Sequence, residues 1–149
     1  MKTLVLGLGN PILSDDSVGF RVIDELKAGF DKPDLTLVTS SASGLGLLDL
    51  IVGYDKVIII DGIKTEGGQA GKIYRLSPDD FRVTRHSASP HDVNLVTALE
   101  LGRKLGAPLP QEIIIFAIEV VDVTTFSEEC TPEVEKAIPL AVSMVSKEL

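Results

Sequence analysis

GLGNPILSDDSVG, residues 7–19, is the stretch that decides the fold of this 149-residue chain. A short apolar run, Thr3 to Leu8, precedes it and predicts a buried first strand, and a helical pattern follows it. Two glycines and an Asn-Pro pair end the strand abruptly. The acidic loop then carries Asp15 and Asp16 to the start of the helix. In an open α/β sheet, such a loop at the carboxyl end of a strand is where ligands bind.

Strand-like and helix-like segments alternate along the rest of the chain, which is typical of a doubly wound α/β fold. Lys72–Leu76 fits an antiparallel edge strand. We expect one domain, residues 1–149, with a mostly parallel twisted sheet of about five strands flanked by helices. Further strands are predicted at 35–39, 56–61 and 113–121, and helices at 18–29 and 45–53, from Ser77, from Ser89 and from Thr131.

Composition and charge narrow the function classes. The chain is 44% hydrophobic and 24% charged, as expected of a folded protein. Its formal net charge of -8, with no cluster of Lys and Arg, argues against nucleic-acid binding. A single cysteine fits a reducing compartment, and no apolar run approaches the roughly 20 residues of a membrane helix. The first residues do not resemble a signal peptide. We therefore expect a cytoplasmic protein without membrane insertion.

Three side chains of metal-binding type are predicted to share one edge of the sheet. Asp16 follows the first strand, Asp61 ends the strand 56–61, and His91 lies in the first turn of a helix capped by Ser89. Because crossover connections are right-handed and parallel strands share a direction, these segments should meet. Two carboxylates and one imidazole suit a borderline divalent ion such as zinc, nickel or iron. The helix dipole favours the neutral imidazole, which is the metal-binding form.

Each of these residues also has a structural interpretation. Asp15 or Asp16 could cap the helix that follows. Asp61 followed by glycine is typical of a turn after a strand. A lone histidine after proline, such as His91, is typical of the surface. The coincidence of all three at one sheet edge is what favours a site.

Other motifs point to chemistry less strongly. Residues 7–10 resemble a dinucleotide fingerprint, but Ile12 occupies the third glycine position. No Gly-x-Ser-x-Gly elbow surrounds the serines at 40, 41 and 43, which favours a flexible loop or a substrate contact. Cys130 follows two glutamates that should raise its thiol pKa, so we expect a structural cysteine. His86 is a spare imidazole with no assigned role.

Taken together, these motifs resemble those of the hydrogenase maturation proteases. These endopeptidases trim the C-terminal extension from the large subunit of nickel-iron hydrogenases after nickel insertion. The resemblance spans nearly the whole chain and depends on the order and spacing of its motifs. These are Gly7-x-Gly9-Asn10 with the acidic pair ahead of Gly19, the strand ending at Asp61, Gly71-Lys72-Ile73, Ser77-Pro78-Asp79-Asp80 and Ser89-Pro90-His91.

The resemblance implies that Asp16, Asp61 and His91 form the catalytic, metal-contacting site. The metal would be the nickel already bound in the precursor of the large subunit, so that cleavage would require bound nickel. Other divalent ions, such as zinc or cadmium, could occupy the same ligands. Two hydrolytic routes stay open. The metal could polarise the carbonyl or a bound water, or it could serve only recognition while an aspartate acts as general base.

The sequence departs from the family pattern at two places. Asp16 stands where the family often has the longer glutamate, so the backbone must approach the ion more closely or Asp15 must share the task. Residues 39–42, Thr-Ser-Ser-Ala, replace an Asp-Gly-Gly-Thr-like segment associated with substrate choice, which leaves the cognate hydrogenase open.

Two other functions stay open at this point. Residues 7–11 and 18–20 also resemble the opening of bacterial peptidyl-tRNA hydrolase, although Asp and Ser stand where that family has its catalytic histidine. The third alternative is a non-catalytic docking module that uses the same three residues to hold nickel.

Overall fold

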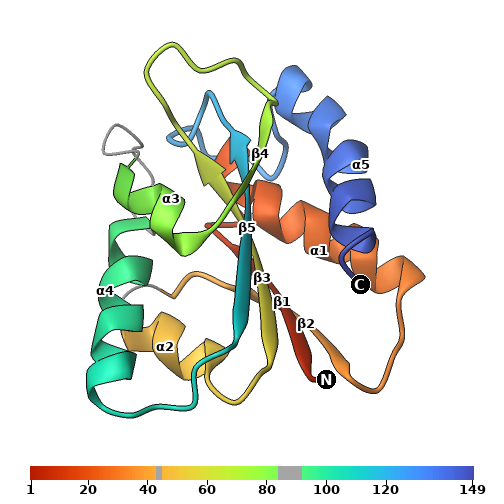
Figure 1. Ribbon diagram of the computed structural model, residues 1–149. Helices are drawn as coiled ribbons and strands as arrows, with labels where there is room; N and C mark the ends of the chain where they lie inside the picture. Colours follow the sequence, from red (N-terminus) through yellow and green to blue (C-terminus); the bar gives the residue numbers. More distant parts are fainter. Residues whose placement is uncertain (43–44, 84–91) are drawn as a thin grey trace.

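The chain folds around one twisted sheet with helices on both faces (Figure 1). The computed structural model describes residues 1–42, 45–83 and 92–149. Within these ranges the sheet has five strands in the order β2-β1-β3-β5-β4. Four strands run parallel and β4, at the edge, is antiparallel to β5. The strands are β1 (Thr3–Leu8), β2 (Leu35–Ser40), β3 (Lys56–Ile63), β4 (Ile73–Leu76) and β5 (Glu112–Glu119). The predicted fold class is confirmed.

Helices α1 and α5 cover one face of the sheet, and α2 and α4 cover the other (Figure 1). The short η1 turn connects β1 to α1 and carries the acidic pair. The helical segments are η1 (Ser14–Ser17), α1 (Val18–Gly29), α2 (Leu45–Ile51), α3 (Pro78–Val83), α4 (Asp92–Lys104) and α5 (Pro132–Ser146). In the described part of the chain, no helix is long and apolar enough to cross a membrane.

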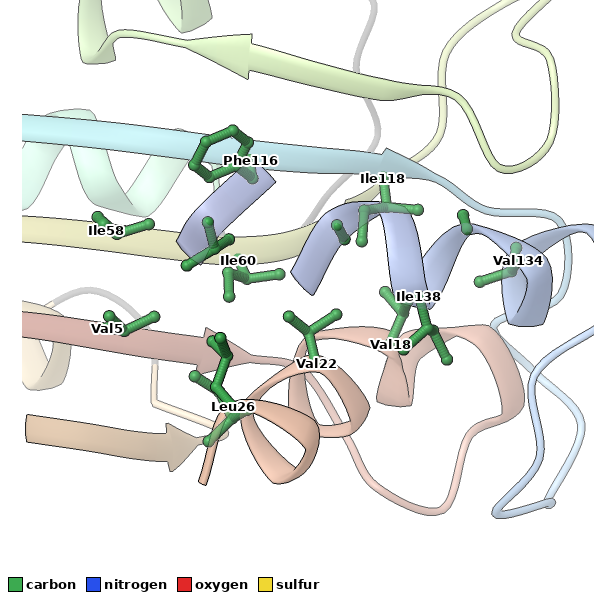
Figure 2. Packing of buried hydrophobic residues seen from close by; sticks show 14 of the residues in the cluster. Val5, Val18, Val22, Leu26, Ile58, Ile60, Phe116, Ile118, Val134 and Ile138 are labelled. Atoms are coloured by element: carbon green, nitrogen blue, oxygen red, sulfur yellow. The ribbon is translucent and has the colours of Figure 1, made fainter. Parts of the chain in front are cut away.

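The central strands are apolar on both sides because helices cover both sides. Ile58 and Ile60 of β3 pack toward α1 and α5, together with Phe116 of β5 (Figure 2). Ile59, between them, packs toward α2 and α4 with Leu6 of β1. Each such side chain contributes roughly 1.5–3 kcal/mol when fully buried. This burial explains the continuous β-branched run in the sequence.

The prediction that a strand ends at Asp61-Gly62 is wrong. β3 continues to Ile63, and its last three residues pair with 117–119 of β5. Ladder hydrogen bonds to this neighbour outweigh the turn preference of an Asp-Gly pair. Val120 packs closely against Gly62, so that a β-carbon built on Gly62 would lie 3.0 Å from the Val120 Cγ1 atom. A β-carbon at Gly62 would therefore be crowded.

The boundary of β5 also differs from the prediction. The strand stops at Glu119 rather than at Val121. The Val121 N–H leaves the ladder and donates to a carboxylate oxygen of Asp15, 2.9 Å away. The predicted cap at Ser89, together with His86 and His91, lies outside the described residues.

Candidate active site at the carboxyl edge of the sheet

The loop between β1 and η1 is closed on itself by backbone hydrogen bonds. The Asn10 N–H donates to the Asp16 carbonyl oxygen at 3.1 Å, and the Asp16 N–H donates to the Leu13 carbonyl oxygen at 3.0 Å. Gly9 enters the loop at a φ of 145°. A β-carbon there would overlap the carbonyl oxygen of Asp16, which explains the glycine. This closed loop determines where Asp16 lies.

A second segment, residues 120–131, fixes the loop from outside. The Ser14 N–H donates to the Ser127 carbonyl oxygen at 2.8 Å, and its hydroxyl donates to the Glu129 carbonyl oxygen at 3.1 Å. Ser14 has a φ of 45°, a strained conformation for a residue with a side chain. The surrounding hydrogen bonds maintain that strain, so the turn carrying Asp16 has a defined shape.

Asp15 is the anchor of this arrangement. Its side chain is fully buried, and its carboxylate accepts backbone N–H groups from Val121 (2.9 Å), Asp122 (3.0 Å) and Thr131 (2.6 Å). The Thr131 hydroxyl lies 2.8 Å from the same carboxylate. Asp15 therefore does not cap η1, which has no side-chain cap hydrogen bond; whether it shares a ligand role with Asp16 stays a prediction. Successive side chains of a 3₁₀ turn diverge by roughly 120°, so this inward anchor turns Asp16 to another side.

Asp61 is a nearly buried carboxylate within β3. Its side chain is on the face of β3 that α2 and α4 cover, and the residue is only 3% exposed. The carboxylate accepts the N–H of Gly62 at 2.8 Å. Burying a carboxylate in an otherwise aliphatic strand costs free energy, so such a position is a candidate for function. Alanine at Asp61 would leave a gap in a packed strand, so asparagine is the better test of its chemistry.

The structure brings Asp16 and Asp61 to the same edge. Asp16 lies on η1, which follows β1, and Asp61 lies on the neighbouring strand β3; η1 lies against the carboxyl end of β3. A methyl group built on Gly62 would lie 3.9 Å from the Asp15 carbonyl oxygen. The described part of α4 begins at Asp92, at the same end of the molecule (Figure 1). His91 lies outside the described residues, so its place in the site stays a prediction.

Neither carboxylate belongs to a complete metal site among the residues that can be described. In the ranges 1–42, 45–83 and 92–149, no three His, Cys, Asp or Glu side chains are grouped to hold a metal ion. The two carboxylates supply oxygen ligands of the kind that divalent cations accept.

Glu119 is a buried carboxylate that sequence analysis assigned no role. It is 2% exposed and lies two residues beyond Ala117, the β5 partner of Asp61, on the same face of the sheet. Its carboxylate accepts the Thr65 N–H at 2.8 Å, the Thr65 hydroxyl, and the Tyr74 hydroxyl at 3.3 Å. These bonds hold the β3–β4 connection at the edge of the site. The sequence signal that could have identified Glu119 is a charged residue directly after the apolar run 113–118.

Cys130 packs beneath the η1 turn. It is half-buried, with its sulfur 3.6 Å from the Ser17 hydroxyl oxygen. Burial raises the pKa of its thiol, and the nearby carboxylate of Asp15 adds to the rise. The predicted direction is confirmed. The main cause, however, is burial rather than the adjacent glutamates.

A doubly wound α/β sheet with two carboxylates at the carboxyl edge defines a class of small enzymes whose site is built from strand-to-helix loops. Within this class, residues 20–148 match the family model HycI, described as hydrogenase maturation protease. The chain belongs to the hydrogenase maturation protease family and is accordingly a protease.

Individual relatives agree with this assignment. The chain is 26% identical over 147 residues to the hydrogenase 2 maturation protease of Escherichia coli K12, covering 97% of this chain and 88% of that protein. It is 24% identical over 151 residues to the hydrogenase expression/formation protein HupD of Bradyrhizobium diazoefficiens, covering 99% and 78%.

Solved structures show the same fold. The E. coli hydrogenase maturating endopeptidase HybD superposes with a TM-score of 0.82 at 26% identity, covering 97% of this chain and 90% of that one. The HybD protease of Thermococcus kodakarensis gives a TM-score of 0.74 at 21% identity, covering 99% and 98%. These findings confirm the predicted family and favour it over peptidyl-tRNA hydrolase.

Proposed function

We propose that this protein is the endopeptidase that removes the C-terminal extension from the precursor of a nickel-iron hydrogenase large subunit, after nickel has been inserted. The observation that supports this most directly is the position of Asp61. A nearly buried carboxylate interrupts the aliphatic strand β3 at the sheet edge where η1 presents Asp16. Family membership supplies the reaction class, and these two residues supply groups suited to it.

In this proposal, nickel is part of the substrate and arrives with the precursor. Asp16, Asp61 and His91 complete its coordination, and zinc or cadmium would be accepted by the same oxygen and nitrogen ligands. A precursor without nickel would lack the group that these three side chains bind. The protein would thereby distinguish a metal-loaded precursor from an empty one, and the place of action would be the cytoplasm.

The hydrolytic step requires a water molecule to attack the scissile carbonyl. Bound nickel would polarise that carbonyl when it reaches the site. A carboxylate beside it would accept the proton of the attacking water as general base and pass it to the departing amine nitrogen as the C–N bond breaks. In the alternative route, in which nickel serves recognition alone, Asp61 would be the base because its surroundings exclude most bulk water, and the half-buried Asp16 would contact the incoming metal.

The test is cleavage of a purified, nickel-loaded precursor, followed by mass spectrometry. Wild-type protein should shorten the precursor by the mass of its C-terminal extension. Asp16→Asn, Asp61→Asn and His91→Ala should each abolish the shortening while the thermal unfolding midpoint stays near that of the wild type. Asp24→Asn, an exposed carboxylate on α1, is the matched control. Binding of the precursor without any cleavage by wild type would instead favour the non-catalytic docking module.

A further inference from the structure

Two large apolar side chains are exposed beside the acidic loop. Phe126 is 81% exposed and Ile12 is 48% exposed. An exposed side chain on a loose loop would mean little, but both belong to segments fixed by hydrogen bonds. The Ser127 N–H donates to the Ile12 carbonyl oxygen at 2.9 Å, and the Ser14 N–H donates to the Ser127 carbonyl oxygen at 2.8 Å.

A β-bridge joins the two segments that carry these side chains. Leu13 and Ser127 form this parallel bridge, and Ile12 and Phe126 directly precede them on their segments. Both side chains are exposed. We call this pair of exposed apolar residues the Ile12–Phe126 patch.

The patch belongs to the same two segments that fix the acidic pair. Ile12 lies in the closed loop whose ends are joined by the Asn10 N–H and the Asp16 carbonyl oxygen. Phe126 lies in the segment whose backbone the buried Asp15 carboxylate holds at Val121 and Asp122. One hydrogen-bonded framework therefore carries both the patch and Asp16.

The charge around the patch favours one kind of partner. Segments 9–17 and 120–131 contain no Lys or Arg, and Asp122, Glu128 and Glu129 lie at their surface. Hydrogen bonds from Thr125 and from the Thr124 backbone lower the pKa of Asp122 to about 2, so it is charged at neutral pH. Cations among the described residues also border the area: the Lys64 Nζ donates to the Val121 carbonyl oxygen at 3.2 Å, and Arg21, which is ion-paired with Glu135, lies near Cys130. The net field is negative, which attracts a basic segment.

We propose that the Ile12–Phe126 patch is the docking surface for the precursor chain next to its scissile bond, and that it receives an apolar side chain flanked by basic residues. This inference rests on the proposed function and adds a substrate chemistry to it. The apolar contact supplies affinity, since buried aromatic residues dominate interface energetics. The acidic surroundings supply orientation and speed of encounter.

The experiment measures precursor binding and cleavage separately. Purified nickel-loaded precursor is titrated by calorimetry against wild type, Phe126→Ala, Ile12→Ala and Leu140→Ala, and steady-state cleavage is measured for each. Leu140 is the matched control because it is 57% exposed on α5, outside the two segments. Phe126→Ala should weaken binding and raise KM about 10- to 30-fold, with kcat changed less than about twofold. Leu140→Ala should match wild type.

A second pair of measurements tests the charge. Glu128→Gln combined with Glu129→Gln should slow association, and the difference from wild type should shrink as salt is raised. Unchanged affinity and KM in Phe126→Ala, with normal wild-type cleavage, would overturn the docking surface and leave the proposed function intact. Binding of the precursor by the wild type without cleavage would overturn the proposed function. The affinities of wild type and Phe126→Ala would still show whether the patch is the docking surface. A dimer that Phe126→Ala dissociates without loss of precursor affinity would also overturn the docking surface.

Discussion

Replacing Asp15 by alanine should loosen the turn that carries Asp16. The substitution removes the acceptor for three backbone N–H groups, those of Val121, Asp122 and Thr131. An unsatisfied buried donor costs about 1–3 kcal/mol, so three would cost about 3–9 kcal/mol in a sealed interior. Val121 is half exposed, however, and water can reach its N–H. We therefore expect a loss of about 3 kcal/mol in the free energy of unfolding, near the lower limit.

The assay is equilibrium urea unfolding, supported by thermal melting. For a domain of this size, a loss of about 3 kcal/mol lowers the melting temperature by roughly 6–12 °C. Asp15→Asn should fall between wild type and alanine, because it keeps one acceptor oxygen but turns an NH₂ group toward the donors. Asp24→Asn, on the exposed face of α1, should leave the midpoint unchanged. A loss under about 1 kcal/mol in Asp15→Ala would refute the assignment of Asp15 as the anchor.

Three further predictions follow from the same geometry. Gly9→Ala should abolish cleavage and lower the free energy of unfolding by about 2–3 kcal/mol, because the added β-carbon would overlap the Asp16 carbonyl oxygen. Normal processing of the precursor by this variant would contradict the prediction. The pKa of Asp122 is about 2 when folded against 3.8 ordinarily, so its stabilisation is complete above about pH 4 and is lost toward pH 2. The difference in melting temperature between wild type and Asp122→Asn should therefore shrink over that range, and a constant difference would count against it. The Cys130 thiol should react slowly with iodoacetamide and show its pH inflection above 9.0, its ordinary pKa, whereas an inflection below that value would be inconsistent with its burial.

Much of the fold was predictable because local signals agree with it. The glycines after β1, the β-branched run of β3 and the helical spacing in α1 and α5 each indicate the observed element. The antiparallel edge strand predicted at Lys72–Leu76 is also present, as β4. The continuation of β3 through Asp61 was not predictable from the sequence. The strand that pairs with it there is β5, which lies more than 50 residues later in the chain.

The acidic pair shows why the site was only partly predictable. Sequence alone leaves Asp15 and Asp16 equivalent, since both could cap a helix or bind a metal. What separates them is the segment 121–131, whose N–H groups bind Asp15 from more than 100 residues away. Phe126 likewise gave no local signal, because its exposure depends on the pairing of its segment with the loop at Leu13.

The central claim is that the protein recognises nickel in the precursor through Asp16, Asp61 and His91. The most direct test compares the affinities of nickel-loaded and nickel-free precursor for the wild type and for His91→Ala. We expect the wild type to prefer nickel-loaded precursor at least about tenfold, equivalent to about 1.4 kcal/mol, and this ratio to fall to about one in the variant. An undiminished nickel preference in His91→Ala, or none in the wild type, would contradict it.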